Sequence, residues 1–219
     1  MRFIAILAVA LAGGGALPAT AEDLDCRLGV TGGAVFGRSQ HVGSNGGAYT
    51  DTFDVNGRAG GVQFGCLAAR DRMRYGAALD LMDTNARGNT QELDPNQNFF
   101  AETSFDWIGT MRAVGGYQMD PRVMVYLTAG LAFSALQIRV CRVSGAFAGT
   151  CAGSSATVWG VVGGVGAQYQ VSRRWSLNVE YLAFGFENKE FPTPATFGDR
   201  GGGVRPEAQV LRAGLNFHF

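Results

Sequence analysis

The feature that most constrains the fold of this chain is a strict alternation of apolar and polar residues. In segment 175–181, WSLNVEY, every odd position is apolar or aromatic and every even position is polar. The C-terminal segment 211–219 repeats the pattern, with an apolar phase that holds Leu211, Ala213, Leu215, Phe217 and Phe219. A period of two residues is typical of a β-strand whose two faces meet different surroundings. The sequence therefore predicts strands with one apolar and one polar face.

Six further segments follow the same pattern, two of them weaker and rich in glycine: 28–36, 61–68, 75–82, 105–117, 123–135 and 158–171. The links between segments alternate in length, with short links at 70–72, 118–121 and 172–174 and long links at 38–56, 83–98, 137–155 and 187–204. This alternation is typical of outer-membrane barrels, whereas a soluble lipocalin-like barrel or a β-sandwich lacks it and turns its apolar face inward. We therefore predict an all-β fold, an eight-stranded antiparallel transmembrane β-barrel with short periplasmic turns and long external loops.

The N-terminal residues predict export. Arg2 precedes an apolar stretch over residues 3–17, and Ala19-Thr20-Ala21 has the small-x-small pattern that a signal peptidase recognises. We expect a signal peptide over residues 1–21 and a barrel domain over residues 22–219. Beyond residue 21 no apolar run has the length of a membrane-spanning helix, so export through the inner membrane predicts a place in the bacterial outer membrane.

Composition narrows the classes of function. The chain has 18 basic and 18 acidic residues, and no basic run could serve as a nucleic-acid footprint. The 33 glycines argue against long helices, and the aromatic content argues against disorder. Binding to nucleic acid is therefore not expected.

The four cysteines predict two disulfides, because the cell envelope is oxidising. Opposite residues of a hairpin have a constant sum of residue numbers. Cys26 and Cys66 centre on a glycine-rich tip, and Cys141 and Cys151 centre on the turn between the fifth and sixth predicted strands. We expect one pair near the periplasm and the other in an external loop. A metal site is disfavoured because no histidine lies near these cysteines in sequence.

Charged and polar residues fall on the second phase of several strands. They are Asp80, Asp106, Arg112, Gln168, Glu180 and Arg212. Side chains fill the interior of a small barrel, so charges there must pair. Paired carboxylates could also suggest a glycosidase, but acids and arginines are intermixed over separate strands, which favours a structural lumenal network.

Only His41 and His218 are available for acid–base catalysis, and neither has a serine and an acid at a spacing that places all three on one strand face. The glycine-rich pieces 163–166 and 201–203 carry no phosphate-binding motif. The sequence thus predicts no catalytic residue, metal or cofactor.

Aromatic residues gather towards the predicted strand ends, as in the girdles of membrane barrels. The external set is Trp107, Phe133, Trp159, Phe184 and Phe186, and the periplasmic set is Tyr75, Tyr117, Tyr169, Trp175, Phe217 and Phe219.

Three stretches carry a resemblance to a known family. They are 107–112 leading through Gly116-Tyr117 to 125–132, then 164–169 followed by 174–182, and the terminal 210–219. In these stretches the chain resembles the porin-like outer-membrane immunogenic proteins of Gram-negative bacteria, relatives of the outer-membrane protein A type of transmembrane domain. The four cysteines depart from the family pattern, as does Gln168, which stands where the family often has an acidic residue.

The resemblance implies an eight-stranded barrel with both termini in the periplasm. It also implies insertion by the barrel-assembly machinery, after escort by periplasmic chaperones. A C-terminal strand that ends in Phe is the family's assembly signal, which here means Leu215, Phe217 and Phe219.

The expected function is structural. We predict a barrel that supports the envelope, contacts outer-membrane lipid and lipopolysaccharide, and presents external loops to an unknown surface ligand. The alternatives are a narrow channel, a receptor for a small ligand such as haem, and a lipid A-modifying enzyme of the kind that uses His and Ser.

Overall fold

A computed structural model describes residues 24–42, 50–91, 99–143, 148–190 and 203–219. The predicted signal peptide lies outside these residues. None of the described residues belongs to a helix long and apolar enough to cross a membrane.

The described chain forms ten β-segments. They are β1 (Leu24–Val42), β2 (Phe53–Arg70), β3 (Met73–Thr84), β4 (Arg87–Gln91), β5 (Phe99–Gln118), β6 (Val123–Arg142), β7 (Cys151–Gln170), β8 (Trp175–Phe186), β9 (Lys189–Glu190) and β10 (Gly203–His218). β3 and β4 both pair with β2 and β5, and β8 and β9 both pair with β10, so each couple is one interrupted strand. The ten segments therefore make eight strands.

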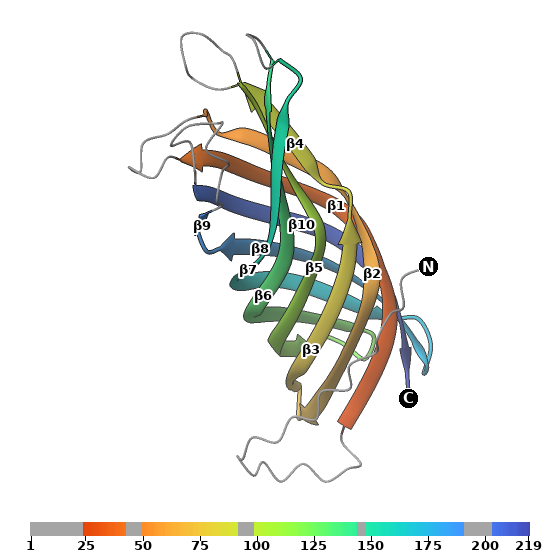
Figure 1. Cartoon of the computed structure of the whole chain (residues 1–219). Coiled ribbons are helices and arrows are strands. Elements are labelled where there is room, and N and C mark those ends of the chain that lie inside the picture. Colours follow the sequence, from red (N-terminus) through yellow and green to blue (C-terminus); the bar gives the residue numbers. More distant parts are fainter. Residues whose placement is uncertain (1–23, 43–49, 92–98, 144–147, 191–202) are drawn as a thin grey trace.

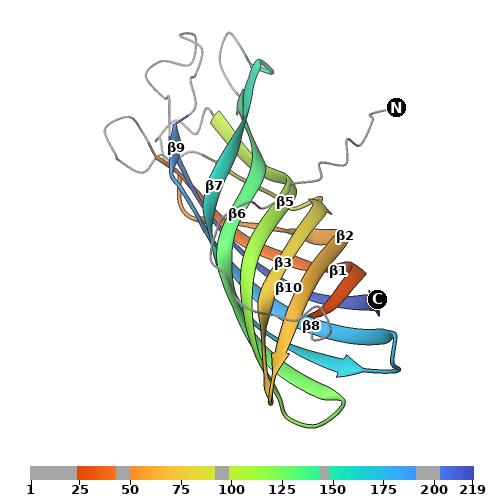
Figure 2. The ribbon, with the colours of Figure 1, turned by 90° about the horizontal axis from the view of Figure 1, so that it is seen from below.

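The sheet closes on itself. Every pairing is antiparallel, and β1 pairs with β2 on one side and with β10 on the other. In Figure 2 the ends of β2, β1 and β10 follow one another along the right-hand side of the view. Arg27 of β1 lies opposite His218 of β10, which brings the beginning of β1 and the C-terminus to one end of the barrel (Figure 1). The predicted eight-stranded barrel is confirmed.

The strands are longer than the sequence predicted. The link expected at 137–155 is mostly strand, because β6 and β7 stay in register from Val123↔Tyr169 to Cys141↔Cys151. The paired ends of these strands project at the top of Figure 1. The turns at the opposite end are as short as predicted, with Asp71-Arg72 joining β2 to β3.

The outer surface carries an apolar belt of membrane height. On β5 the outward residues are apolar or glycine from Trp107 to Tyr117, which is the length of about 9–11 residues that a tilted strand needs to cross a bilayer. Beyond Trp107 the next three outward residues, Asp106, Ser104 and Glu102, are polar. Trp107, Phe133 and Trp159 form an aromatic row at the external edge, with ring centroids 5.9 and 5.7 Å apart.

Two members of the predicted external girdle face the other way. Phe184 and Phe186 are buried inside the barrel, because the lipid-facing phase of β8 is the odd-numbered one. The prediction that they belong to the girdle is wrong. At the periplasmic edge, Trp175 and Phe217 pack edge to face at 5.2 Å.

Candidate functional site: the barrel interior

Four charged side chains meet at the middle of the lumen. Arg112 of β5 lies 2.9 Å from Asp80 of β3 and 2.9 Å from Glu180 of β8. Arg212 of β10 contacts the same two carboxylates. Each acid therefore touches two arginines and each arginine touches two acids, which gives a closed ring of four charges, hereafter the charge ring.

Uncharged neighbours complete the hydrogen bonding of the charge ring. Thr110 donates to Asp80, and Arg112 donates to Thr128 over 3.4 Å. All four ring residues are at most 5 % exposed, so these partners replace the water that the charges lose on burial.

Glycines make room for the two arginines. Gly130 lies directly opposite Arg112, and Gly33 lies directly opposite Arg212. A Cβ at Gly130 would lie 2.6 Å from the Cα of Arg112, and a Cβ at Gly33 would lie 2.6 Å from the Cα of Arg212. The inward phase of these strands therefore needs glycine beside each arginine.

Two residues of the predicted lumenal network lie outside the charge ring. Asp106 stands in a β-bulge, where the register of β5 against β6 shifts between Phe105 and Trp107. The bulge reverses the phase of the strand, so Phe105 points inward and Asp106 accepts a hydrogen bond from the exposed Gln137 on the outside. The prediction that Asp106 faces the lumen is wrong. Gln168 does face the lumen, but nearer the periplasm, and its Oε1 has no partner among the described residues.

An apolar plug fills the lumen on the external side of the charge ring. Leu182 and Val210 lie opposite each other, one inward position beyond the Glu180–Arg212 pair. Each of the eight strands contributes to the plug at least one apolar side chain that is at most 1 % exposed. Examples in chain order are Val35, Val55, Met82, Ile108, Leu136, Val158, Leu182 and Val210. Solvent therefore does not reach this level of the barrel.

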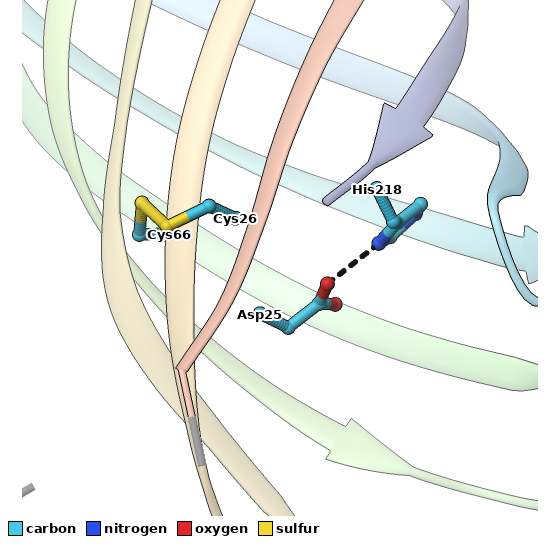
Figure 3. Close-up of a disulfide and its surroundings, with 4 residues drawn as sticks. All are labelled: Asp25, Cys26, Cys66 and His218. Atoms are coloured by element: carbon cyan, nitrogen blue, oxygen red, sulfur yellow. Dashed lines mark hydrogen bonds and ion pairs between the residues drawn. A yellow bond between two sulfur atoms is a disulfide. The ribbon is translucent and has the colours of Figure 1, made fainter. Parts of the chain in front are cut away.

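A hydrogen-bonded serine, histidine and aspartate occupy the periplasmic end. His218 Nε2 lies 2.7 Å from Ser176 Oγ, and His218 Nδ1 lies 2.8 Å from Asp25 Oδ1. Figure 3 shows Asp25 and His218 pointing towards each other beside the Cys26–Cys66 disulfide. The three residues come from β8, β10 and β1, so only closure of the barrel brings them together, and a search within single strands missed them.

The three residues are linked in the order of a catalytic Ser-His-Asp triad, but the serine is not accessible to a substrate. Ser176 is fully buried, whereas a nucleophile must meet its substrate. Asn216 of β10 lies opposite Ser176, is also fully buried, and forms hydrogen bonds with Gln63 and Asn178. Among the described residues, Ser176 therefore has no exposed surface at which a substrate could meet it.

The described residues also hold no group of three or more His, Cys, Asp or Glu side chains that could bind a metal ion. The residues of the expected assembly signal, Leu215, Phe217 and Phe219, lie on the outward phase of the chain's end.

The cysteines pair as the hairpin symmetry predicts. Cys26 lies opposite Cys66 at the periplasmic end of β1 and β2, and Cys141 lies opposite Cys151 at the projecting end of β6 and β7.

Replacing Cys141 and Cys151 together by serine should spare insertion and cost at most about 2–4 kcal/mol of stability in the chain-entropy picture. The reason is that this bond closes a hairpin end beyond the apolar belt, while the β6–β7 ladder below it stays intact. Urea unfolding in lipid vesicles and the heat-dependent gel shift of folded barrels would measure the two effects. Loss of the gel shift in this variant would instead give the projecting hairpin a role in assembly.

The closed sheet, the apolar belt and the filled interior define a transmembrane β-barrel protein. The family model for the outer membrane protein beta-barrel domain matches residues 7–219, and the chain belongs to this family. Its place is the bacterial outer membrane.

The relatives agree with this assignment. The 31 kDa outer-membrane immunogenic proteins of Brucella melitensis and Brucella suis are each 33% identical to the chain over 135 residues, 58% of this chain and 53% of the relative. The chain thus spans about half the length of the curated relatives it matches. The resemblance stated from the sequence is confirmed.

Solved structures share the fold. The outer membrane protein OprG from Pseudomonas aeruginosa superimposes with a TM-score of 0.52 at 11% identity, over 88% of this chain and 95% of that one. The outer membrane protease OmpT from Escherichia coli gives a TM-score of 0.51 at 13% identity, over 89% and 97%. At these identities the likeness concerns the fold alone.

Proposed function

We propose that the protein is a structural outer-membrane barrel that supports the integrity of the envelope and presents its external loops at the cell surface. The observation that carries this proposal is the sealed interior, in which the apolar plug lies directly on the charge ring. A conducting pore needs a continuous polar path, and the plug interrupts it. A filled, salt-bridged barrel suits a permanent membrane anchor.

Two of the alternative functions have less support. A narrow channel would require the plug to move. A lipid A-modifying enzyme would require Ser176 to become accessible, and Ser176 lies towards the periplasmic end, far from the outer leaflet that carries lipid A. A receptor for a small ligand such as haem would act through the external loops, whose central residues lie outside the described part of the chain.

The test is a strain that lacks the protein. We expect greater sensitivity to detergent and to large antibiotics, and increased shedding of outer-membrane vesicles, with recovery when the wild-type chain is restored. Unchanged barrier properties would contradict the structural role.

Two measurements on purified protein and one on cells separate the alternatives. We expect no stable conductance steps in planar bilayers, no saturable change in the haem absorption spectrum, and the same lipid A mass profile in cells with and without the protein.

We also expect the barrel-assembly machinery and periplasmic chaperones to be its assembly partners, which depletion of each factor would test.

A further inference from the structure

The periplasmic mouth of the barrel contains a cavity of about 380 Å³, hereafter the vestibule. Its lining includes the buried side chains of Leu67, Met124, Gln168 and His218. Mouths of β-barrels are a common place for ligand sites. Because the charge ring and the apolar plug close the lumen on the external side of these residues, the vestibule can hold a ligand but does not lead through the membrane.

The vestibule is positively charged. Arg74, Arg122 and Arg173 line it, and among the described residues Asp25 is its one acidic lining residue, already engaged by His218. The side chains of Arg122 and Arg173 make no hydrogen bond or ion pair with any described residue, and each stands on a short periplasmic turn. Charge complementarity therefore favours a ligand with one or more carboxylate or phosphate groups.

A buried acceptor restricts the ligand further. Gln168 is only 7 % exposed, and its Oε1 has no hydrogen-bond partner among the described residues. An unpaired buried oxygen is costly, and a ligand that brings an N–H donor would satisfy it. Inorganic phosphate can offer only its own P–OH group, whereas a peptide with a free carboxylate supplies several N–H donors and negative charge together.

We propose that the vestibule binds a short peptide with free carboxylates, the chemistry of the stem peptides of the peptidoglycan that faces this end of the barrel. This inference rests on the proposed structural function and gives it a partner. The arginines of the two turns hold the carboxylates, and the Gln168 amide oxygen accepts from a peptide N–H or an ammonium group. The barrel would then hold the outer membrane to the cell wall from its own mouth.

The test uses the full mature chain folded in lipid nanodiscs and a defined soluble disaccharide-tetrapeptide from peptidoglycan. Calorimetry should show saturable binding that is lost when the carboxylates of the probe are amidated. Replacing Arg122 and Arg173 by serine should weaken binding by roughly tenfold or more for each arginine. Gln168→Met, which leaves the charge unchanged, should weaken it by about three- to tenfold.

The matched control is the double change to serine of Arg70, the last residue of β2, and Arg72 of the turn that follows, which removes the same charge from the periplasmic end outside the vestibule lining. We expect this control to bind the probe as the wild type does. Equal weakening in both double variants, or no binding by the wild type, would overturn the proposal. So would tighter binding to anionic phospholipid nanodiscs that depends on Arg122 and Arg173, since the site would then serve lipid head groups.

Failure of the vestibule proposal can be distinguished from failure of the proposed structural function. If the wild type does not bind the probe while the strain that lacks the protein still has a weakened barrier, the vestibule proposal falls and the structural role stands. If the barrier is unchanged, the structural role falls whatever the calorimetry shows.

Discussion

Replacing Arg112 with leucine is expected to lower the free energy of unfolding by about 3–5 kcal/mol. The guanidinium contacts both Asp80 and Glu180, and Arg212 alone cannot balance two buried carboxylates. The change therefore leaves an uncompensated negative charge inside the barrel. Equilibrium unfolding in urea with lipid vesicles would measure the loss.

A second variant tests whether the loss of stability comes from a carboxylate left unpaired inside the barrel or from the loss of the ion-pair contacts themselves. Replacing Asp80, Arg112, Glu180 and Arg212 together by leucine removes every charge at once, and such replacements of buried ion pairs are often neutral or stabilising. The fourfold variant should lose far less stability than four times the single change. An unfolding midpoint that Arg112→Leu leaves unchanged would contradict the buried ring.

The alternation of residues was enough to predict the eight strands and the members of the charge ring. Glu180 and Arg212 lie on the polar phase of segments whose period is unbroken, and Arg112 lies on the polar phase of β5 on the periplasmic side of its bulge, so each inward direction follows from the sequence. Asp106 was misplaced because a bulge adds one residue to β5, and a bulge leaves no mark in the polar pattern.

The apolar plug was not predicted from the sequence, for a different reason. Beyond Glu180, β8 continues as Leu182, Phe184 and Phe186, which face inward although they are apolar. The expectation that the inward phase is polar holds only where the lumen contains polar groups or water. In a small barrel the interior is packed like a protein core, and apolar side chains can fill it equally well.

Closure of the sheet explains why the trio of Asp25, Ser176 and His218 could not be predicted from the sequence. Asp25, Ser176 and His218 belong to three strands that are neighbours only because β1 pairs with β10 and β10 pairs with β8. The vestibule arises in the same way, from two turns and the ends of the strands around them. Contacts of this kind depend on the register between strands, and alternation within one strand does not encode that register.

The orientation of β10 in the membrane gives the prediction that most directly tests the barrel. Ala213 faces outward between Val179 of β8 and Gly32 of β1, midway between the periplasmic Phe217 and the external Gln209. Ala213→Arg should cost about 2–4 kcal/mol, because it places a charge near the centre of the hydrocarbon layer.

The control must lie on the same strand and the same face. Asn216 is unsuitable although alternation places it in the lumen, because it is fully buried and bonded to Gln63 and Asn178, so a larger side chain there would disrupt packing. Gln209 is exposed and lies beside Phe36 at the external edge of the apolar belt. Gln209→Arg should cost no more than about 1 kcal/mol, since the cost of a lipid-facing arginine falls towards the interface. Both variants can be refolded into lipid vesicles and unfolded in urea. Equal stability of the two would mean that Ala213 does not meet hydrocarbon, and the placement of the apolar belt in the bilayer would have to be abandoned.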